Sequence, residues 1–249
     1  MKNEKIAICI MSGGLDSLCA TAYVKNYKKY TIKIISFYYG QRAKREIIQS
    51  KKLAKALNSD EYRTVDISFM KELYGNSNVL TNSKFSIPSK FDHSIVVPIR
   101  NAVFITIATA WAFSVNADLI VLGAHTGDFH YPDCRPKFIQ SITNALNTGE
   151  EDKIKNGSKR KISIWSPSLE GITKYELLKL GHKLLGDTIF ESWSCYTNGK
   201  RIHKDIVQCG KCESCINRKN AFTTAQLEDK TRYATESRKR KGKAKRDIH

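Results

Sequence analysis

The sequence predicts an α/β protein built on a doubly wound, mostly parallel five-stranded sheet with a small helical region at the C-terminus. Three observations indicate this fold class. Apolar runs typical of buried strands alternate with segments whose apolar residues recur at helical spacing. The 249 residues suffice for one large domain with an appendage. A glycine-rich turn directly follows the first strand, where open parallel sheets bind ligands.

The first half of the chain alternates strands and helices. The expected elements are strand KIAICIM (5–11), helix SLCATAYVKNYKK (17–29), strand TIKIISFYY (31–39), helix AKREIIQSKKLAKAL (43–57) and strand YRTVDI (62–67). Right-handed crossovers then place helices on both faces of the sheet. Residues 75–94 are polar, rich in Asn and Ser, and without a period, so we expect a long loop near a site, of the kind that acts as a lid.

The second half continues the alternation. The expected elements are helix NAVFITIATAWAFSV (101–115), strand ADLIVLGA (117–124), helix PKFIQSITNAL (136–146), a charged linker (149–161), strand KISIW (161–165) and helix TKYELLKLGHKLL (173–185). Pro136 suits the first turn of its helix, and Thr173 suits an N-cap. The expected division is an α/β domain at 1–190, a four-cysteine region at 191–226 and a basic, flexible tail at 227–249.

Charge and hydropathy limit the class of partner and the compartment. The chain has 42 Lys and Arg against 24 Asp and Glu, a net charge of +18, which favours anionic partners such as nucleotides or nucleic acid. Residues 228–249 contribute nine basic and four acidic side chains, so the rest of the chain is itself basic. The longest nearly apolar stretch, 103–115, has thirteen residues and falls short of the roughly 20 that span a bilayer. We therefore expect a cytoplasmic protein without a membrane span.

The stretch SGGLDS (12–17) lies between the first strand and the first helix. Gly13 and Gly14 let the backbone N–H groups turn toward a ligand, Ser12 and Ser17 add hydroxyl donors, and the helix adds its dipole. These features predict a phosphate cradle. Asp16 would repel phosphate directly, so its expected role is to hold Mg²⁺ or to organise the loop. The simpler alternative is a strand-to-helix turn that binds nothing.

The cysteines predict a metal site. Seven cysteines, an odd number, argue against a disulfide framework. Cys209, Cys212 and Cys215 are spaced C-x2-C-x2-C, and Cys195 lies upstream in WSCY. Four thiolates close a tetrahedral Zn²⁺ site without an open position, which is typical of structural zinc. An iron–sulfur cluster and free thiols are the alternatives; a ferredoxin-like run would want a further Cys three residues after Cys215, and none is there.

Five motifs in order connect the chain to a known family. SGGxDS resembles the signature of the PP-loop ATP pyrophosphatases, whose fold is HUP-like. With it occur YYGQR (38–42), VPIRNAVF (97–104), YPDCRPKF (131–138) and SWSCY…CGKCESCINRKNAF (192–222). From about residue 5 to about residue 225 the chain resembles the 7-cyano-7-deazaguanine synthase family. The resemblance implies an ATP-dependent C–N ligase that is a homodimer and converts 7-carboxy-7-deazaguanine and ammonia into the nitrile preQ0. The route passes through an adenylated acid and an adenylated amide, and preQ0 is a precursor of queuosine and archaeosine.

The resemblance also assigns residues. It implies that ATP is bound by Met11, Ser12, Gly13, Gly14, Leu15, Asp16, Ser17, Leu18, Arg100, Asn101 and Gly123. It implies that the substrate lies near Gln41, Arg42, Tyr131, Asp133 and Arg135, and that Asp16, Arg135 and Lys174 are catalytic. Asp133 suits the amine and ring N–H of the base, Arg135 suits the carboxylate, and Lys174 suits developing negative charge. A structural ion pair between Asp133 and Arg135, a solvated Lys174, and polar groups at a helix start for Gln41 and Arg42 are the alternatives. Trp193 and Tyr196 are expected to pack around the metal.

Three positions depart from the family pattern. Ala43 replaces a usual His, Lys137 replaces a usual acidic residue, and GDFH lacks the Ser-Gly usual before Tyr131. These differences concern substrate placement and leave the adenylation residues intact. The long stretch between Cys195 and Cys209 is expected to be a surface excursion.

Other functions stay open at the level of sequence. One is a PP-loop enzyme that adenylates a tRNA base, another is a relative that attaches a deazaguanine to a protein carboxylate, and a third is a zinc-stabilised nucleic-acid-binding protein without enzymatic activity. The basic tail could contact tRNA, although catalysis on a small molecule does not require it. The source of ammonia and the choice between the queuosine and archaeosine pathways cannot be read from the residues.

Overall fold

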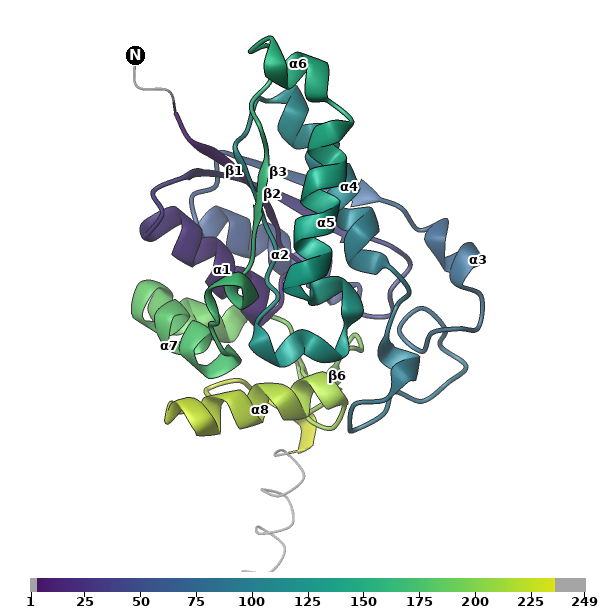
Figure 1. The fold of residues 1–249 in the computed structure, drawn as a ribbon. Coiled ribbons are helices and arrows are strands. Elements are labelled where there is room, and N and C mark those ends of the chain that lie inside the picture. The colour runs from purple at the N-terminus through teal and green to yellow at the C-terminus, as the bar shows by residue number, and fades with distance from the viewer. Residues whose placement is uncertain (1–3, 236–249) are drawn as a thin grey trace, which may run out of the picture.

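The computed structural model describes residues 4–235 and contains a five-stranded sheet in the order β3-β2-β1-β4-β5 (Figure 1). Its strands are β1 (Ile6–Ile10), β2 (Thr31–Tyr38), β3 (Glu61–Asp66), β4 (Leu119–Val121) and β5 (Ser163–Trp165). All four neighbouring pairs are parallel. The strand order reverses between β1 and its neighbour β4, which creates a switch point at the carboxyl ends. The predicted fold class is therefore confirmed.

Helices cover both faces of the sheet because its inner strands are apolar on both sides. Ile8 and Ile10 of β1 face α4 (Arg100–Ser114) and α5 (Pro136–Thr148), whereas Ala7 and Cys9 face α1 (Leu15–Asn26) and α2 (Arg45–Ala56). Outside α1 lies α7 (Lys174–Leu185). A Cβ atom at Gly181 of α7 would lie 2.2 Å from the Cys19 Sγ of α1, so glycine permits this close helix contact.

The predicted helix starts at Pro136 and Thr173 are confirmed. Pro136 is the first residue of α5. Thr173 caps α7, with its side chain accepting from the Glu176 N–H while the Glu176 carboxylate accepts from the Thr173 N–H at 2.9 Å.

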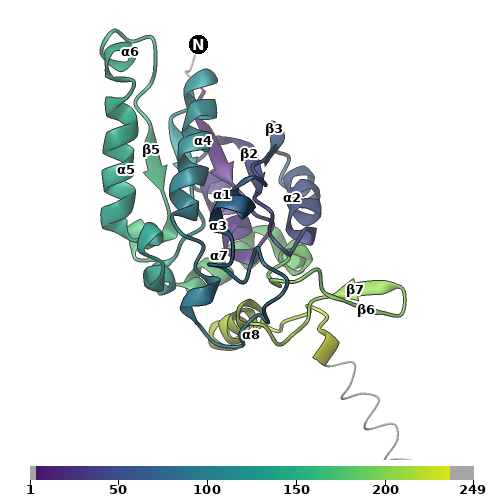
Figure 2. The ribbon, with the colours of Figure 1, turned by 90° about the vertical axis from the view of Figure 1, so that its right-hand side faces the viewer.

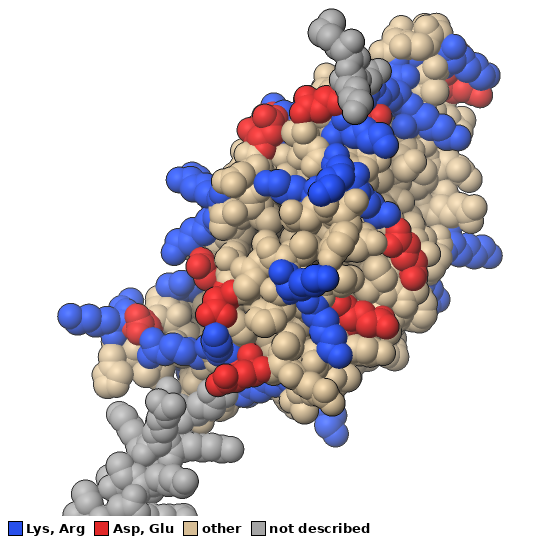
Figure 3. All heavy atoms as spheres, turned by 90° about the vertical axis from the view of Figure 1, so that its left-hand side faces the viewer, with Lys and Arg blue, Asp and Glu red and all other residues tan. Residues whose placement is uncertain are grey.

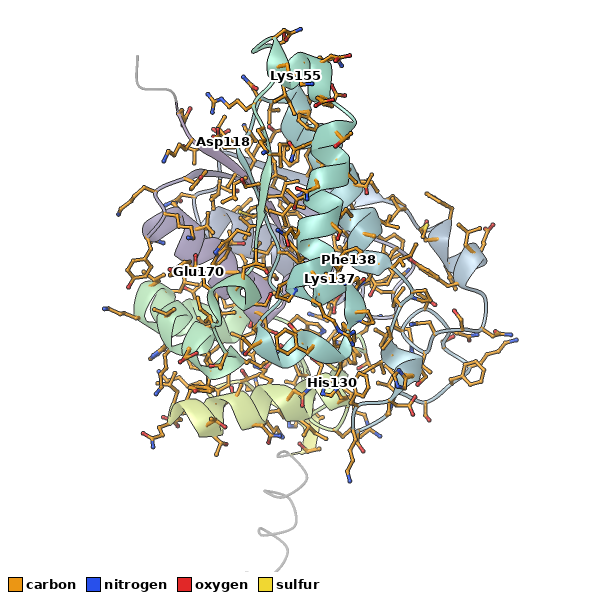
Figure 4. The ribbon with its side chains drawn as sticks, viewed as in Figure 1. Asp118, His130, Lys137, Phe138, Lys155 and Glu170 are labelled. Carbon is orange, nitrogen blue, oxygen red and sulfur yellow. The ribbon has the colours of Figure 1, made fainter. Side chains whose placement is uncertain are left out.

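Two short helices were not predicted, α3 (Met70–Tyr74) and α6 (Glu151–Lys155). The second lies inside the stretch taken for a linker, where Lys155 pairs with Glu151 one turn away at 2.8 Å. Figure 4 shows Lys155 at the end of the molecule farthest from α8.

Helix α4 is the most apolar helix, and residues 93–114 are long and apolar enough to cross a membrane by length and composition alone. Within residues 4–235 it is the one segment that meets this test. Phe104, Ile105, Ala108 and Trp111 of α4 are buried against the sheet, which is the behaviour of a core helix.

A side-chain amide binds the backbone directly before the outer strand β5. Asn147 of α5 donates from Nδ2 to the Ile162 carbonyl at 2.8 Å and accepts from the Ile162 N–H at 2.9 Å. Asn147 is 9% exposed. Its amide thus forms with the chain the pair of hydrogen bonds that a neighbouring strand would form.

The C-terminal region packs below the carboxyl ends of the strands in Figure 1. Between Cys195 and Cys209 the chain forms an antiparallel hairpin of β6 (Lys200–Ile202) and β7 (Asp205–Val207), which projects from the body in Figure 2. The expected surface excursion is therefore a β-hairpin. Helix α8 (Glu213–Ala225) follows.

One buried arginine holds this region together. Arg218 of α8 is 1% exposed and donates to Ser192, Ser194, Ile189 and Thr231. Residues 227–235 of the predicted tail take part in the packing: Tyr233 is 3% exposed, and the Ala234 N–H donates to the Gln208 carbonyl at 2.9 Å. The remainder of that tail, 236–249, lies outside the described residues.

Basic side chains are spread over the surface. Figure 3 shows one face on which Lys and Arg stand among Asp and Glu rather than in one continuous patch. The positive charge of the described body is therefore distributed on this face.

Candidate active site

A cavity of about 620 Å³ lies at the carboxyl ends of the strands. It is lined by the ends of β1, β2 and β4, by the start of α7 and by one face of α8, the helix below the sheet in Figure 1. His130, which lines the cavity, lies just above α8 in Figure 4. This is the position that the strand order predicts for a ligand site.

The SGGLDS loop forms one wall of the cavity and is fixed by close packing. Gly13 has φ +90°, and a Cβ there would lie 2.3 Å from the Glu46 carbonyl oxygen. The Gly14 N–H donates to Ser12 Oγ at 3.2 Å, and Ser12 Oγ lies 3.3 Å from Ser17 Oγ. Helix α1 begins at Leu15, two residues earlier than predicted. The helix N-terminus and both hydroxyls thus adjoin the same loop.

Four further residues in or beside the loop also had predicted roles. Gly123, at the end of β4, presses against α1, and a Cβ there would lie 2.7 Å from Ser17 Cα. Met11 and Leu15 line the cavity, whereas Leu18 is buried in the core beneath it.

Asp16 and Lys174 form an ion pair across the cavity. Lys174 Nζ donates to Asp16 Oδ2 at 2.8 Å. Burial raises the pKa of Asp16, but the charge of Lys174 and the hydrogen bond that it donates outweigh burial and hold that pKa below its usual value. Burial lowers the pKa of Lys174, but Asp16 and Asp128 outweigh it, so that pKa lies above its usual value. Both side chains are therefore charged at neutral pH.

His125 and Asp128 stand beside this pair. The Asp128 carboxylate accepts from the His125 backbone N–H at 3.0 Å, and His125 Nδ1 accepts from the Gly127 N–H at 3.1 Å. The two side chains form a capping box at a single turn of helix. His125 Nε2 points to Asp16 Oδ1, 3.9 Å away.

Arg100 and Glu46 line another part of the cavity, among aromatic rings. Arg100 donates to the Tyr39 hydroxyl at 3.3 Å, and its guanidinium lies 5.8 Å from the Phe104 ring centre. Burial lowers the pKa of Arg100, but Tyr39 and Asp133 raise it above the usual value. Burial raises the pKa of Glu46 to about 8, and Arg100 offsets this only in part. Tyr131 and Tyr196 complete this part of the cavity.

The four predicted metal ligands come together. The Sγ atoms of Cys195, Cys209, Cys212 and Cys215 all lie within 4.8 Å of one another, and all four side chains are buried. Tetrahedral Zn–S bonds of about 2.3 Å place sulfurs roughly 3.8 Å apart, and Cys209 and Cys215 are 3.9 Å apart. The N–H of Cys212 donates to the Cys209 sulfur at 3.3 Å. The cluster therefore has the ligands and spacing of a four-thiolate metal site.

The sequence model of the family described as "Queuosine biosynthesis protein QueC" matches residues 6–226. The chain belongs to the QueC family. A 7-cyano-7-deazaguanine synthase of Coxiella burnetii is 34% identical over 236 residues, covering 93% of this chain and 99% of the relative. One of Methanococcus maripaludis is 34% identical over 246 residues, covering 92% and 99%. The family that the sequence motifs predicted is thus confirmed.

Solved structures are more distant. The U34-tRNA thiolase NcsA from Methanococcus maripaludis, with its [4Fe-4S] cluster, is 18% identical and covers 90% of this chain and 68% of that one at a TM-score of 0.42. A predicted tRNA methyltransferase subunit from Methanocaldococcus jannaschii is also 18% identical, covering 72% and 74% at a TM-score of 0.45.

In this QueC-family protein, three residues assigned to the substrate face elsewhere. Asp133 accepts from the Asn101 N–H at 2.9 Å and from the Asn101 side chain at 3.2 Å. Asp133 therefore caps the start of α4. Arg135 is exposed and donates to the Phe129 carbonyl at 2.9 Å. Arg42 donates to the carbonyls of Val79 and Phe85 and so fastens the 75–94 loop. None of the three is among the residues lining the cavity.

Five of the other assigned residues line the cavity. Its lining includes Arg100, Asn101, Gly123, Gln41 and Tyr131. Gln41 is buried and holds the turn after β2, donating to the Phe37 carbonyl and accepting from the Tyr39 N–H. Ala43 is buried, while Lys137 and Phe138 lie at the start of α5, as Figure 4 shows, outside the cavity lining.

The structure adds residues that the sequence did not single out. They are Glu46, His125, Asp128 and Glu213, and Tyr196, which was expected to pack around the metal, lines the cavity as well. Tyr196 follows Cys195 directly, and Glu213 follows Cys212 directly. The segments that carry the metal ligands therefore also form a wall of the cavity, a role beyond the packing expected for Trp193 and Tyr196.

Proposed function

We propose that this chain is a 7-cyano-7-deazaguanine synthase, which converts 7-carboxy-7-deazaguanine, ammonia and ATP into preQ0 through an adenylated acid and an adenylated amide. The observation that carries the proposal is the composition of one cavity. One part of it holds a glycine loop, a helix N-terminus and a lysine, and another part is lined by aromatic rings. The two relatives above, matched over nearly their full length, carry that name.

The chemistry needs positive charge at two places. A carboxylate is a poor electrophile, so ATP first converts it to an acyl adenylate whose AMP leaves readily when ammonia attacks. The resulting amide is activated at its oxygen in the same way, and AMP leaves again with loss of a proton to give the nitrile. Both activations develop negative charge on phosphate and on the acyl oxygen. Within residues 4–235, Arg100 and Lys174 are the Arg and Lys side chains that line the cavity. We assign them the cationic roles, including the role first given to Arg135.

Magnesium belongs to the proposal because of the charge balance. The cavity is lined by four carboxyl side chains, Asp16, Glu46, Asp128 and Glu213, against two basic ones, Arg100 and Lys174. Burial disfavours the charge of Glu46, but the other three carboxyl groups still outnumber the two cations. A nucleotide triphosphate entering such a site needs a divalent cation. Asp16 is placed to hold it, because its Oδ2 is bound to Lys174 while Oδ1 is 3.9 Å from the nearest His nitrogen. Zinc bound by the four cysteines supplies rigidity to the cavity wall formed by residues 193–196 and 213–214.

Glu46 takes the role first given to Asp133. The base of the substrate presents a ring N–H and an amine side by side, which a carboxylate accepts together. Both oxygens of Asp133 are engaged by Asn101. Glu46 projects from the first turn of α2 into the aromatic part of the cavity. Burial disfavours its charge, and two N–H donors from a ligand would compensate for it.

Several wider features stay proposals. They are a homodimer in the cytoplasm, an ATP-binding domain at 1–190 beside the metal region at 191–226, and a tail whose contact with tRNA is not needed for catalysis.

The deciding experiment is the mass of the product formed from 7-carboxy-7-deazaguanine, ATP, Mg²⁺ and ammonium, together with the AMP released. We expect preQ0 and AMP. Asp16→Ala should abolish AMP formation and retain bound zinc, and the matched control Asp152→Ala, on an exposed turn of α6, should retain both. AMP formation that needs a tRNA or a protein acceptor, or an active Asp16→Ala enzyme, would contradict the proposal.

A further inference from the structure

His125 is a buried polar side chain that faces the cavity. It lies two residues after Gly123, at the end of β4, and is 5% exposed. Its ring is part of the cavity wall next to the Asp16–Lys174 pair. The family motifs in the sequence did not point to it.

The hydrogen bonds of the ring fix where its proton lies. Nδ1 accepts from the Gly127 N–H at 3.1 Å, so in the neutral ring the proton is on Nε2. Nε2 is buried and has no hydrogen-bond partner anywhere in residues 4–235. The nearest carboxylate oxygen, Asp16 Oδ1, is 3.9 Å away, beyond hydrogen-bond distance. An unsatisfied buried donor is costly, and natural structures keep few of them.

The groups around His125 Nε2 indicate which kind of partner this N–H donor lacks. A metal ion is excluded at Nε2, because that nitrogen carries the proton. The missing partner is therefore an acceptor, and Asp16 is already held by Lys174. Gly123 packs against Ser17, so the end of β4 that carries His125 lies beside the first turn of α1 and its phosphate loop. Phosphate oxygens are the acceptors that such a loop collects.

We propose that His125 Nε2–H donates to a non-bridging oxygen of the β- or γ-phosphate of ATP. The same hydrogen bond is kept to the pyrophosphate after the bond to the α-phosphate has broken. The inference rests on the proposed function in one respect, that ATP is the ligand of this loop. It assigns His125 a positioning role: the side chain holds the leaving group and exchanges no proton with it.

Asparagine separates the two contacts of His125. In His125→Asn the amide oxygen takes the place of Nδ1 and keeps the bond from the Gly127 N–H, but the side chain does not reach the place of Nε2. His125→Gln has the opposite properties, with a distal N–H and no proximal acceptor. His125→Ala loses both contacts, so its comparison with His125→Asn reports the contribution of the cap to folding.

The test is calorimetric titration of the full chain with magnesium pyrophosphate and, separately, with AMP. A hydrogen bond to a charged group corresponds to about tenfold or more in affinity. We expect His125→Asn to weaken pyrophosphate binding by about that factor, with AMP binding and the melting temperature unchanged. His125→Gln should restore part of the pyrophosphate affinity. In steady state, KM for ATP should rise in His125→Asn while KM for ammonium does not.

Three results would overturn the inference. They are unchanged pyrophosphate affinity in His125→Asn, an equal loss for pyrophosphate and AMP, and a loss for AMP alone, which would place the donor at the α-phosphate. The outcome is independent of the product assay. If the wild-type protein forms no preQ0, the proposed function is contradicted. If the His125→Asn variant of that protein still binds pyrophosphate more weakly than the wild type, this inference stands.

Discussion

Replacing Gly123 by alanine tests the contact on which the geometry of the site depends. The added Cβ would lie 2.7 Å from Ser17 Cα, 2.8 Å from Ser17 N and 3.1 Å from Ser17 Cβ. Two of these atoms are backbone in the first turn of α1, so no side-chain rotation relieves the overlap. The end of β4 and the start of α1 must move apart by roughly 0.5–1 Å to reach ordinary contact distances.

The cost follows from this overlap. Overpacking of this kind destabilises by about 1–3 kcal/mol. For a chain of this size each kcal/mol lowers the melting temperature by about 2–4 °C, so we expect a fall of about 2–12 °C. The same movement displaces the phosphate loop, and misplacing reacting groups by about 1 Å can cost a hundredfold in rate. AMP formation in Gly123→Ala should therefore fall more steeply than stability does.

The assays are thermal unfolding and AMP release as a function of ATP concentration. Gly149→Ala is the matched control, because Gly149 has φ −63° and its nearest neighbour to an added Cβ lies 3.5 Å away. It should be neutral or slightly stabilising. A Gly123→Ala protein with the wild-type melting temperature and KM for ATP would show that the strand end and the loop are not in the contact described here.

Three further changes have defined outcomes. Removing the metal with a chelator should lower the melting temperature and abolish AMP formation, because the segments that carry the four cysteines also form a cavity wall at residues 193–196 and 213–214. Full activity in a protein that metal analysis shows to be metal-free would refute this. Ile99→Gly should raise stability by about 1 kcal/mol in denaturant unfolding, since Ile99 is 65% exposed and has φ +45°, a costly conformation for a β-branched residue; a loss of stability would contradict it. The pKa of Glu46, raised by burial from 4.5 to about 8, means that the folded wild type loses stability as pH rises from 4.5 through 8, by at most about 5 kcal/mol. Glu46→Gln should not show this loss, so the difference in melting temperature between Glu46→Gln and the wild type should grow from pH 5 to pH 8. A difference that stays constant over this range would exclude a buried, titrating Glu46.

The sequence predicted the sheet and the metal site well because both depend on local patterns. Strand alternation, Pro136 and Thr173 mark elements that the structure contains nearly at the expected residues. The spacing of the last three cysteines already brings them within reach of one ion. The short helices α3 and α6 could not be predicted, because five residues are too few to establish a helical period.

Side-chain direction could not be predicted in the same way. Asp133 and Arg135 belong to a distinctive motif, yet neither lines the cavity. Asp133 caps α4, because the start of that helix needs an acceptor for its N–H groups, and Arg135 donates to the Phe129 carbonyl at the surface. Glu46 and His125 face the cavity only because α2 and the end of β4 meet the phosphate loop in space. Nothing in the spacing of residues along the chain records those meetings.

The pairing of Asn147 with the backbone at Ile162 has a consequence for the behaviour of the protein in concentrated solution. A bare strand at the margin of a sheet offers donors and acceptors to any other extended chain and so invites self-association. Here the amide occupies the carbonyl and N–H of Ile162, the residue directly before β5. Removing it by Asn147→Leu would free that margin, and such molecules should precipitate where the parent stays dispersed.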